Sequence, residues 1–241
     1  MLAPGQPFPP IARAMPAGSS APGLLAAGGA LDVPTLVQAY AHAVFPWFNP
    51  GEPVLWWSPN PRMVLRTEQF KLHRSLRKTL ARFRAGAGAQ VRIDTAFEQV
   101  MLGCARSPRP GQRGTWIGPA MLEAYVQLHR AGYAHSVETW IDGELAAGLY
   151  CVSLGRAVFG ESMFTQVTDG SKIALAALVA FCRANALPLI DCQQKTAHLA
   201  LLGAAEMPRA AFARAVRALA REPAPVWRFQ PVYWGALLPP P

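Results

Sequence analysis

Residues 155–194 read GRAVFGESMFTQVTDGSKIALAALVAFCRANALPLIDCQQ. Their hydrophobic pattern predicts a strand that ends at Glu161, an apolar helix from about Ser171 to Asn185, and an apolar strand from Leu187 to Asp191. Polar groups follow each strand. Because ligands gather at the carboxyl ends of strands in open α/β layers, the carboxylate and amide that follow the second strand, in the run from Asp191 to Gln194, are a candidate reaction centre.

The preceding sequence predicts further elements of the same kind. Arg62 to Arg66 and Val91 to Ile93 are expected as strands. Ala134 to Ile141 and Glu144 to Leu154 form a predicted hairpin, because the Asp142-Gly143 pair between them favours a tight turn. Helices are expected over residues 34–43, 70–83, 95–104, 119–130, 195–202 and 209–220.

Two of these helices carry start signals. Thr95 stands three residues before Glu98, which is the spacing of a capping box. Pro119 opens the helix over 119–130, where the missing N–H of proline costs no hydrogen bond. The sequence therefore predicts that both helices begin at these residues.

The domain organisation follows from Pro- and Gly-rich segments. Residues 1–30 are rich in turn formers, and the prolines of residues 45–61 break any helix or strand. We expect a small N-terminal α/β domain over 1–61 and a larger domain over 62–241. The order of elements in the larger domain resembles an acetyltransferase-like (GNAT-related) mixed sheet better than a Rossmann sheet, so the predicted fold class is α+β.

The charge of the chain is strongly basic for so apolar a composition. Apolar residues make up 51% of the chain and charged residues 15%, yet the net charge is +9, and all but four of the 23 basic residues are arginine. Arginine grips phosphate with a planar fork, so the excess fits a nucleic-acid or membrane-surface partner. A GC-rich genome that favours arginine codons explains the same excess, and charge alone leaves both explanations open.

The remaining composition argues for a cytoplasmic protein without a metal. The cysteines form no CxxC pair and sit among apolar neighbours, as reduced thiols do. The five histidines are scattered, so we expect no metal site. We expect no signal peptide, because no basic region followed by an apolar run opens the sequence. The helix predicted near 173–182 is too short to cross a bilayer.

Three carboxylate and amide groups are candidates for chemistry. Asp191 and Gln193 are two residues apart on an extended segment, so their side chains share one face. The carboxylate could accept a proton from an amine, and the amide could orient that amine or its target. Alternatively, Asp191 caps the following helix and Gln193 lies on the surface. Glu161 could bind a cationic group or simply face water at a hairpin end.

Aromatic and basic side chains suggest contact with nucleic acid. Loop tryptophans stack on bases, but they also commonly cover a core. The basic helix over 71–84 could follow a phosphate backbone, or it could be a solvated helix face. Residues 111–114 lack the Lys-Ser/Thr pair of a phosphate-binding loop. The tryptophans considered for a loop cluster are Trp47, Trp56, Trp57 and Trp116, together with Phe48.

Taken together, these residues resemble the bacterial leucyl/phenylalanyl-tRNA–protein transferase family. The similar blocks run in order along nearly the whole chain, and many short blocks in register are far more specific than any one of them. They are Phe8-Pro9-Pro10, Gly23 to Gly29, Phe45 to Phe48, Trp56 to Arg62, Gly114 to Ile117, Ala134 to Glu138, Phe159 to Phe164, Leu189 to Gln193, His198-Leu199, Leu202 to Ala204 and Pro208-Arg209. The resemblance also implies that residues 8–30 belong to an ordered N-terminal domain.

The resemblance implies a cytoplasmic aminoacyltransferase. Such an enzyme moves Leu, Phe or, less readily, Met from aminoacyl-tRNA to the N-terminal Arg or Lys of an acceptor protein, and so feeds the bacterial N-end degradation pathway. The ester of aminoacyl-tRNA is already activated, so no cofactor is expected. We also expect a monomer with no membrane partner. The rival interpretations are a related transferase with another acceptor and an RNA-binding module without catalysis.

The resemblance also implies roles for particular residues. Asp191 would attract the proton of the acceptor amine, Gln193 would steer that amine, and Glu161 would hold it. Three groups of substrate contacts complete the expected site: Trp56, Trp57 and Trp116 around the terminal adenosine; Phe159, Gly160 and Met163 around the Leu or Phe side chain; and Arg74, Arg77, Lys78, Arg82 and Arg113 along the tRNA acceptor stem.

Overall fold

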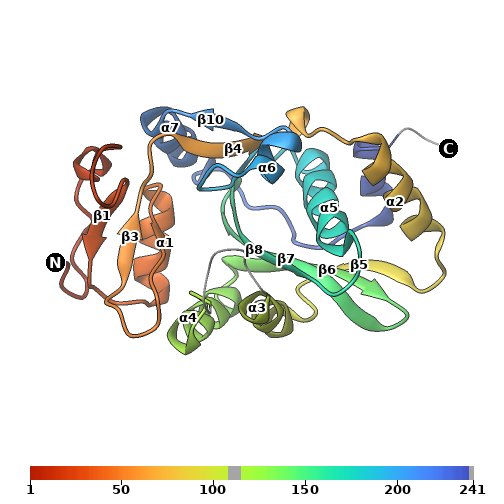
Figure 1. The fold of residues 1–241 in the computed structure, drawn as a ribbon, viewed down its shortest axis with the longest axis horizontal. Helices are drawn as coiled ribbons and strands as arrows, with labels where there is room; N and C mark the ends of the chain where they lie inside the picture. The colour runs from red at the N-terminus through yellow and green to blue at the C-terminus, as the bar shows by residue number, and fades with distance from the viewer. Residues whose placement is uncertain (108–114, 239–241) are drawn as a thin grey trace.

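The computed structural model describes residues 1–107 and 115–238. Its centre is a seven-stranded mixed sheet in the order β10-β4-β9-β8-β7-β6-β5, with helices on both faces (Figure 1). A second, three-stranded sheet in the order β1-β3-β2 lies toward the N-terminus beside α1. The α+β class predicted from the sequence, with a small N-terminal part and a larger mixed-sheet part, is therefore confirmed.

The strands of the large sheet alternate apolar and polar positions or are buried throughout. Those from the middle of the chain are long and form an antiparallel meander, because the Asp142-Gly143 turn sets the register between β6 and β7. The strands of this sheet are β4 (Arg62–Arg66), β5 (Ala89–Ile93), β6 (Ala134–Ile141), β7 (Glu144–Leu154), β8 (Ala157–Thr165), β9 (Leu189–Asp191) and β10 (Ala205–Met207).

Helices cover each face of this sheet with separate apolar cores. The core that contains α1, α3, α4 and α7 lies on one face, and the core that contains α2 and α5 lies on the other. The apolar helix α5 is buried along almost its whole length, as expected for a helix without a polar stripe. The helices are α1 (Val33–Ala41), α2 (Arg74–Ala85), α3 (Phe97–Arg106), α4 (Pro119–Arg130), α5 (Gly170–Ala184), α6 (Ala197–Leu201) and α7 (Arg209–Leu219).

The small N-terminal sheet packs on the large part through a shared core. Leu36 and Tyr40 of α1 belong to the same buried cluster as Tyr125 of α4. Asp32 caps α1 by accepting a hydrogen bond from the Thr35 N–H at 2.9 Å. The strands of this sheet are β1 (Leu24–Ala27), β2 (Phe45–Pro46) and β3 (Leu55–Trp57).

β8 and β9 pair only briefly before they diverge. They are parallel neighbours, and their register joins Val158 to Ile190 and Phe159 to Asp191. Beyond that point β9 ends, whereas β8 continues to Thr165 beside β7. The residues that follow each pairing point, Gly160 and Cys192, therefore open the sheet and leave space between the strands.

Several expected boundaries differ from the structure. The predicted capping box of α3 is wrong: α3 begins at Phe97, and the N–H groups of Thr95 and Ala96 both donate to Glu138 of β6 at 2.8 Å. A carboxylate from a distant strand thus binds the two N–H groups just before the first turn of α3, which itself has no side-chain cap. The basic helix α2 begins at Arg74 rather than near Phe70. The short edge strand β10 and the 3-10 helix Pro231–Ala236 were not expected.

Candidate active site

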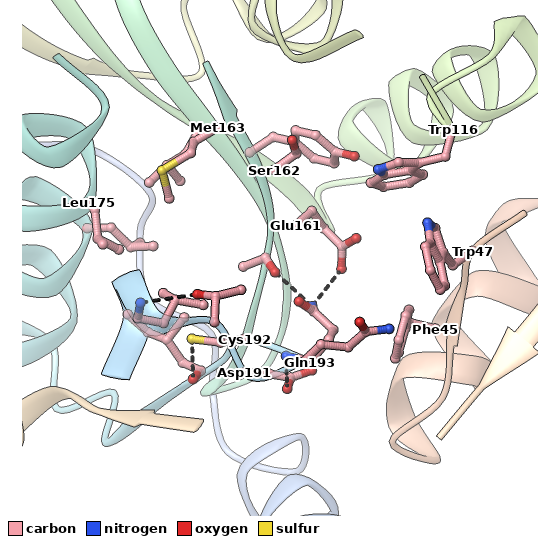
Figure 2. Close-up of a pocket in the computed structure, with 18 of the residues that line it drawn as sticks. Phe45, Trp47, Trp116, Glu161, Ser162, Met163, Leu175, Asp191, Cys192 and Gln193 are labelled. Atoms are coloured by element: carbon pink, nitrogen blue, oxygen red, sulfur yellow. Dashed lines mark hydrogen bonds between the residues drawn. The ribbon is translucent and has the colours of Figure 1, made fainter. Parts of the chain in front are cut away.

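A cavity of about 410 Å³ occupies the space where β8 and β9 diverge. One side is apolar and comes from β8, α5 and the end of β9. The other side is aromatic, with Phe45 and Trp47 from the N-terminal part and Trp116 from the segment before α4 (Figure 2). Polar groups stand between the two sides. The apolar lining consists of Leu149, Met163, Leu175, Leu178, Ile190 and Leu199, and the polar groups include Glu161, Ser162, Gln193, Gln194 and Thr196.

Glu161 brings an ionisable carboxyl group into this cavity. It follows Gly160 on β8 and is only partly exposed. Its Oε1 accepts a hydrogen bond from the Tyr40 hydroxyl at 2.7 Å and one from Gln193 Nε2 at 3.3 Å. Burial raises the pKa of the Glu161 carboxyl to about 8; the Tyr40 hydrogen bond and the Arg62 charge oppose the rise, and the Asp191 charge adds to it. The group can therefore gain or lose a proton near neutral pH.

Asp191 is held in a buried ion pair with Arg62 of β4. Arg62 Nε donates to Oδ1 at 2.7 Å and Nη2 donates to Oδ2 at 2.5 Å, and both side chains are fully buried. The guanidinium also lies between the rings of Phe45 and Phe212, at 4.7 and 4.8 Å from their centroids. Both carboxylate oxygens of Asp191 are thus already occupied by a charged partner.

Gln193 is fixed at the cavity by its main chain and its amide. Its backbone φ is 55°, and its N–H donates to Asp191 Oδ1 at 3.0 Å. The side-chain nitrogen donates to the Gly160 carbonyl at 2.7 Å as well as to Glu161. Asp191 and Gln193 therefore do not act as an isolated pair on one face of a strand; Asp191 holds the backbone turn that presents the Gln193 amide beside Glu161.

The structure brings one of the three expected tryptophans into the cavity. Trp116 lines it beside Trp47, on the aromatic side (Figure 2). Trp56 is fully buried and donates to the Gly28 carbonyl at 2.8 Å, so it supports the N-terminal sheet instead. Trp57 stands behind Trp47, with ring centroids 5.6 Å apart, and its Nε1 donates to the Trp47 carbonyl. Trp47, rather than Trp57, is the residue of this pair that lines the cavity.

The other expected contact residues divide in the same way. Gly160 and Met163 line the cavity. Phe159 does not, because its side chain points to the opposite face of β8, where it packs between Tyr40 and Phe212. Arg113 lies outside the residues that the structure describes. The remaining basic residues, Arg74, Arg77, Lys78 and Arg82, are exposed on α2.

Sequence reasoning missed three residues that hold the site. Tyr40 and Arg62 both contact the central carboxylates, and Tyr125 hydrogen-bonds Tyr40. Arg62 could have been predicted from the sequence. It directly precedes the apolar residues of β4, and a buried arginine requires a buried partner. The tyrosines lie within amphipathic helices and look like ordinary core residues.

The described residues contain no group of three or more His, Cys, Asp or Glu side chains that could hold a metal ion. None of the helices in ranges 1–107 and 115–238 has the length and apolar character needed to cross a bilayer. The cavity presents carboxyl, amide and aromatic groups.

Comparison with known proteins agrees with a transferase. Residues 64–217 match the family described as leucyl/phenylalanyl-tRNA protein transferase, and residues 29–60 match the N-terminal domain of the same family. The chain belongs to this family and is an enzyme of its class.

Close relatives cover almost the whole chain. It is 61% identical over 237 residues to the leucyl/phenylalanyl-tRNA–protein transferase of Polaromonas sp. (strain JS666), covering 98% of this chain and 93% of the relative. It is 56% identical over 239 residues to the enzyme of the same name from Albidiferax ferrireducens, covering 99% and 94%. Among solved structures, L-PGS from Bacillus licheniformis aligns with a TM-score of 0.41 at 15% identity, covering 70% of this chain and 58% of that one.

Proposed function

We propose that the protein transfers Leu, Phe or, less readily, Met from aminoacyl-tRNA to the N-terminal Arg or Lys of an acceptor protein in the cytoplasm. The product would carry an N-terminus that marks it for the bacterial N-end degradation pathway. The observation that carries the proposal is the Glu161 carboxyl, poised near neutral pH at the edge of an apolar cavity. Membership of the transferase family supports the identity of the donor.

The apolar side of the cavity would hold the side chain of the donor amino acid. Met163, Leu175 and Leu178 line this side with apolar surface, which suits an apolar donor side chain. One methylene group in such a space changes binding by only about 1–3 kcal/mol, so several apolar donors would be accepted. Polar side chains would be rejected, because they would lose their hydration without compensation.

The aromatic side would hold the terminal adenosine of the tRNA. Trp47 and Trp116 lie beside each other on this side of the cavity, so an adenine ring could stack on either indole. This assignment replaces Trp56 and Trp57 by Trp47 and retains Trp116. Farther away, the exposed basic residues of α2 would contact the phosphates of the acceptor stem, together with Arg113, largely without reading bases.

The chemical step requires a neutral amine. We assign proton transfer to Glu161: its carboxylate takes a proton from the α-amine, whose nitrogen attacks the ester carbonyl carbon. The ester C–O bond then breaks, and the departing ribose oxygen receives a proton. An α-amine has an ordinary pKa near ~7.7–8. Because the pKa of Glu161 is about 8, proton transfer between the two groups is nearly balanced.

Asp191 and Gln193 then have supporting roles in this proposal. Asp191 neutralises Arg62 and holds the turn at Gln193, rather than meeting the amine itself. Gln193 uses its amide nitrogen toward Gly160 and Glu161 in the described part of the chain, so its amide oxygen is available to orient the amine. We also retain the division into domains 1–61 and 62–241, and a monomeric state, as proposals.

The decisive experiment supplies labelled Phe-tRNA to the purified protein with two peptides that differ only in an N-terminal Arg or Ala. Label is expected on the Arg peptide alone, and the Glu161→Gln variant should transfer it far more slowly while binding the tRNA equally well. Label on neither peptide would contradict the transferase proposal and favour an RNA-binding module. Equal label on both would contradict the acceptor rule.

A further inference from the structure

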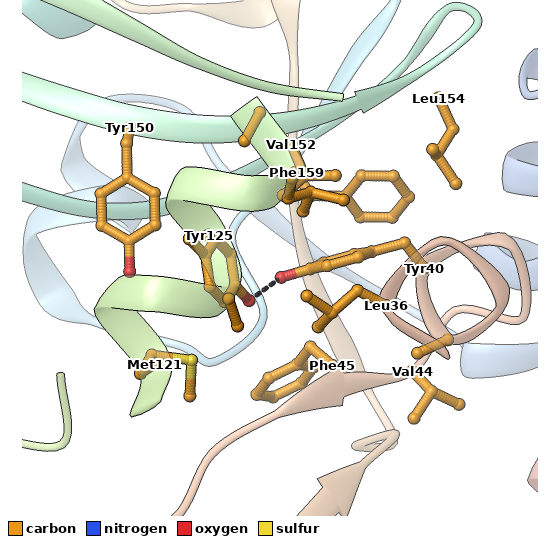
Figure 3. Close-up of a cluster of buried hydrophobic side chains, with 14 of the residues drawn as sticks. Leu36, Tyr40, Val44, Phe45, Met121, Tyr125, Tyr150, Val152, Leu154 and Phe159 are labelled. Carbon is orange, nitrogen blue, oxygen red and sulfur yellow. Dashed lines mark hydrogen bonds between the residues drawn. The ribbon is translucent and has the colours of Figure 1, made fainter. Parts of the chain in front are cut away.

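A chain of two buried phenols ends on the carboxylate of Glu161. The Tyr40 hydroxyl donates to Glu161 Oε1 at 2.7 Å, and the Tyr125 hydroxyl forms a hydrogen bond with the Tyr40 hydroxyl (Figure 3). Both tyrosines are fully buried. The two phenols come from different elements, α1 and α4, and meet a strand, β8, from a third part of the chain.

Glu161 sets which group donates in each of these two hydrogen bonds. An ionised carboxylate only accepts hydrogen bonds, so the Tyr40 proton must point to Glu161. The Tyr40 oxygen is then left as an acceptor, and Tyr125 must supply the proton of the second bond. Two phenols aligned in this way strengthen one another and favour the charged form of the carboxylate.

The packing around the phenols fixes this geometry. The Tyr40 ring lies 4.9 Å from Phe159, and the Tyr125 ring lies 5.6 Å from Tyr150 at an angle of 78°. Burial and the neighbouring Glu161 charge raise the pKa of both tyrosines well above the ordinary value, so both remain protonated donors at any working pH. They act on Glu161 as fixed donors and cannot replace it as a base.

We propose that Tyr40, aligned by Tyr125, is a positioning residue that occupies Oε1 of Glu161 and favours the carboxylate over the protonated acid, which leaves Oε2 for the acceptor amine. This inference rests on the proposed function. It also gives the N-terminal part of the chain a role in the chemical step, because Tyr40 lies in the segment that matches the N-terminal family domain.

The test compares the pH dependence of kcat/KM for an Arg-initiated peptide between pH 6 and pH 9.5, with Phe-tRNA as donor and short reaction times. The peptide amine titrates identically with every variant, so any difference in midpoint reports the enzyme. Tyr40→Phe should raise the midpoint by about one pH unit and lower the rate at pH 7 by about tenfold, with the rate recovering near pH 9.5. Tyr125→Phe should shift it the same way by less.

Two further variants separate positioning from general support of the fold. In the Glu161→Gln background, adding Tyr40→Phe should change the remaining rate by less than about twofold, because the two residues act as one unit. Tyr133→Phe, at an exposed phenol between α4 and β6, should keep the wild-type profile.

The outcomes are distinguishable from those of the proposed function. If the wild-type enzyme transfers no label, the proposed function itself fails. If the wild type is active but Tyr40→Phe slows it by the same factor at every pH, or leaves its profile unchanged, the positioning role of Tyr40 is overturned.

Discussion

Arg62 and Asp191 form a two-pronged ion pair across β4 and β9, with both side chains fully buried. The pair joins strands whose residues are 129 positions apart in the sequence. Its position next to Gln193 means that the same contact that holds the sheet together also sets the turn at the reaction centre. Stability and function should therefore respond together when the pair is broken.

Breaking this pair on one side should be strongly destabilising. Arg62→Met leaves the Asp191 carboxylate buried without a partner, and the expected loss in the free energy of unfolding is about 3–5 kcal/mol. The double variant Arg62→Met/Asp191→Leu removes both charges and should lose clearly less. Urea denaturation of the wild type, the two single variants Arg62→Met and Asp191→Leu, and the double variant measures this. A double variant as unstable as the sum of its single variants would show that the two side chains do not interact.

Gly103 of α3 allows the helix to approach β8 closely. A Cβ at this position would lie 2.7 Å from Cγ of the buried Phe164. Gly103→Ala should therefore cost about 1–3 kcal/mol by overpacking, despite the better helix propensity of alanine. Gly18→Ala is the matched control, because a Cβ there meets nothing within 4 Å. Equal melting temperatures for the two variants would contradict the close contact.

The sequence predicted those elements whose signals are local. The hairpin of β6 and β7 has the expected bounds, because a two-residue Asp-Gly turn fixes its register. Helix α4 begins and ends as expected, because Pro119 marks its first turn. The strand predicted to end at Glu161 continues to Thr165 as β8, so that boundary was wrong, although Glu161 and Gln193 are in hydrogen-bond contact.

The features that could not be predicted depend on contacts between distant residues. The N–H group of Thr95, just before α3, donates to Glu138, which lies 43 residues later. From its place after a strand, Asp191 could be a base. Only the fold shows that Arg62 binds both oxygens of its carboxylate. Likewise, adjacent tryptophans look equivalent in sequence, and the strand geometry of β3 decides that Trp56 is buried while Trp57 supports Trp47.

The proposed stacking of the terminal adenosine on indole rings can be tested by truncation. Trp47→Ala and Trp116→Ala should each weaken binding of Phe-tRNA by about 1–3 kcal/mol, the usual contribution of stacking one base on one aromatic ring. Trp57→Phe retains an aromatic support behind Trp47 and should weaken binding much less. Filter binding with charged tRNA measures the dissociation constants. If Trp57→Phe weakened tRNA binding and the two alanine variants did not, the adenosine would have to be placed at Trp57, on the other side of the N-terminal sheet.

The proposed contact of α2 with tRNA phosphates can be tested against a second basic helix. Reversing charge at Arg74, Arg77 and Arg82 together should weaken tRNA binding and reduce the slope of log K against log salt by about two or more, since each lost phosphate contact removes about 0.7–0.9. The same reversal at Arg214 and Arg217 of α7, and at Arg221 just after its end, provides the matched control, because all three residues are exposed. A larger effect on α7 would assign the RNA surface to that helix.

The raised pKa of Glu161 also predicts how stability depends on pH. The folded carboxyl has a pKa of about 8, against about 4.3 in the unfolded chain. Between these values the folded protein binds the additional proton, so this contribution to stability is complete below about pH 4 and is lost as the pH rises through about 8. Glu161→Gln cannot ionise, and at pH 9 it should exceed the wild type by on the order of 1–2 kcal/mol, an allowance that already discounts for partial exposure.

Guanidinium denaturation at pH 6 and pH 9 checks this expectation, with Glu123→Gln, at an exposed position on α4, as the control. The wild type has lost part of this contribution at pH 6 and all of it at pH 9, so the advantage of Glu161→Gln should be larger at pH 9, whereas the control should follow the wild type at both. The comparison also measures how much free energy of unfolding the protein loses when the buried Glu161 carboxyl ionises, which is the form that can accept a proton from an amine. Parallel pH dependence in all three proteins would mean that the pKa of Glu161 is not raised. The match between its pKa and that of the amine, on which its role as proton acceptor rests, would then be lost.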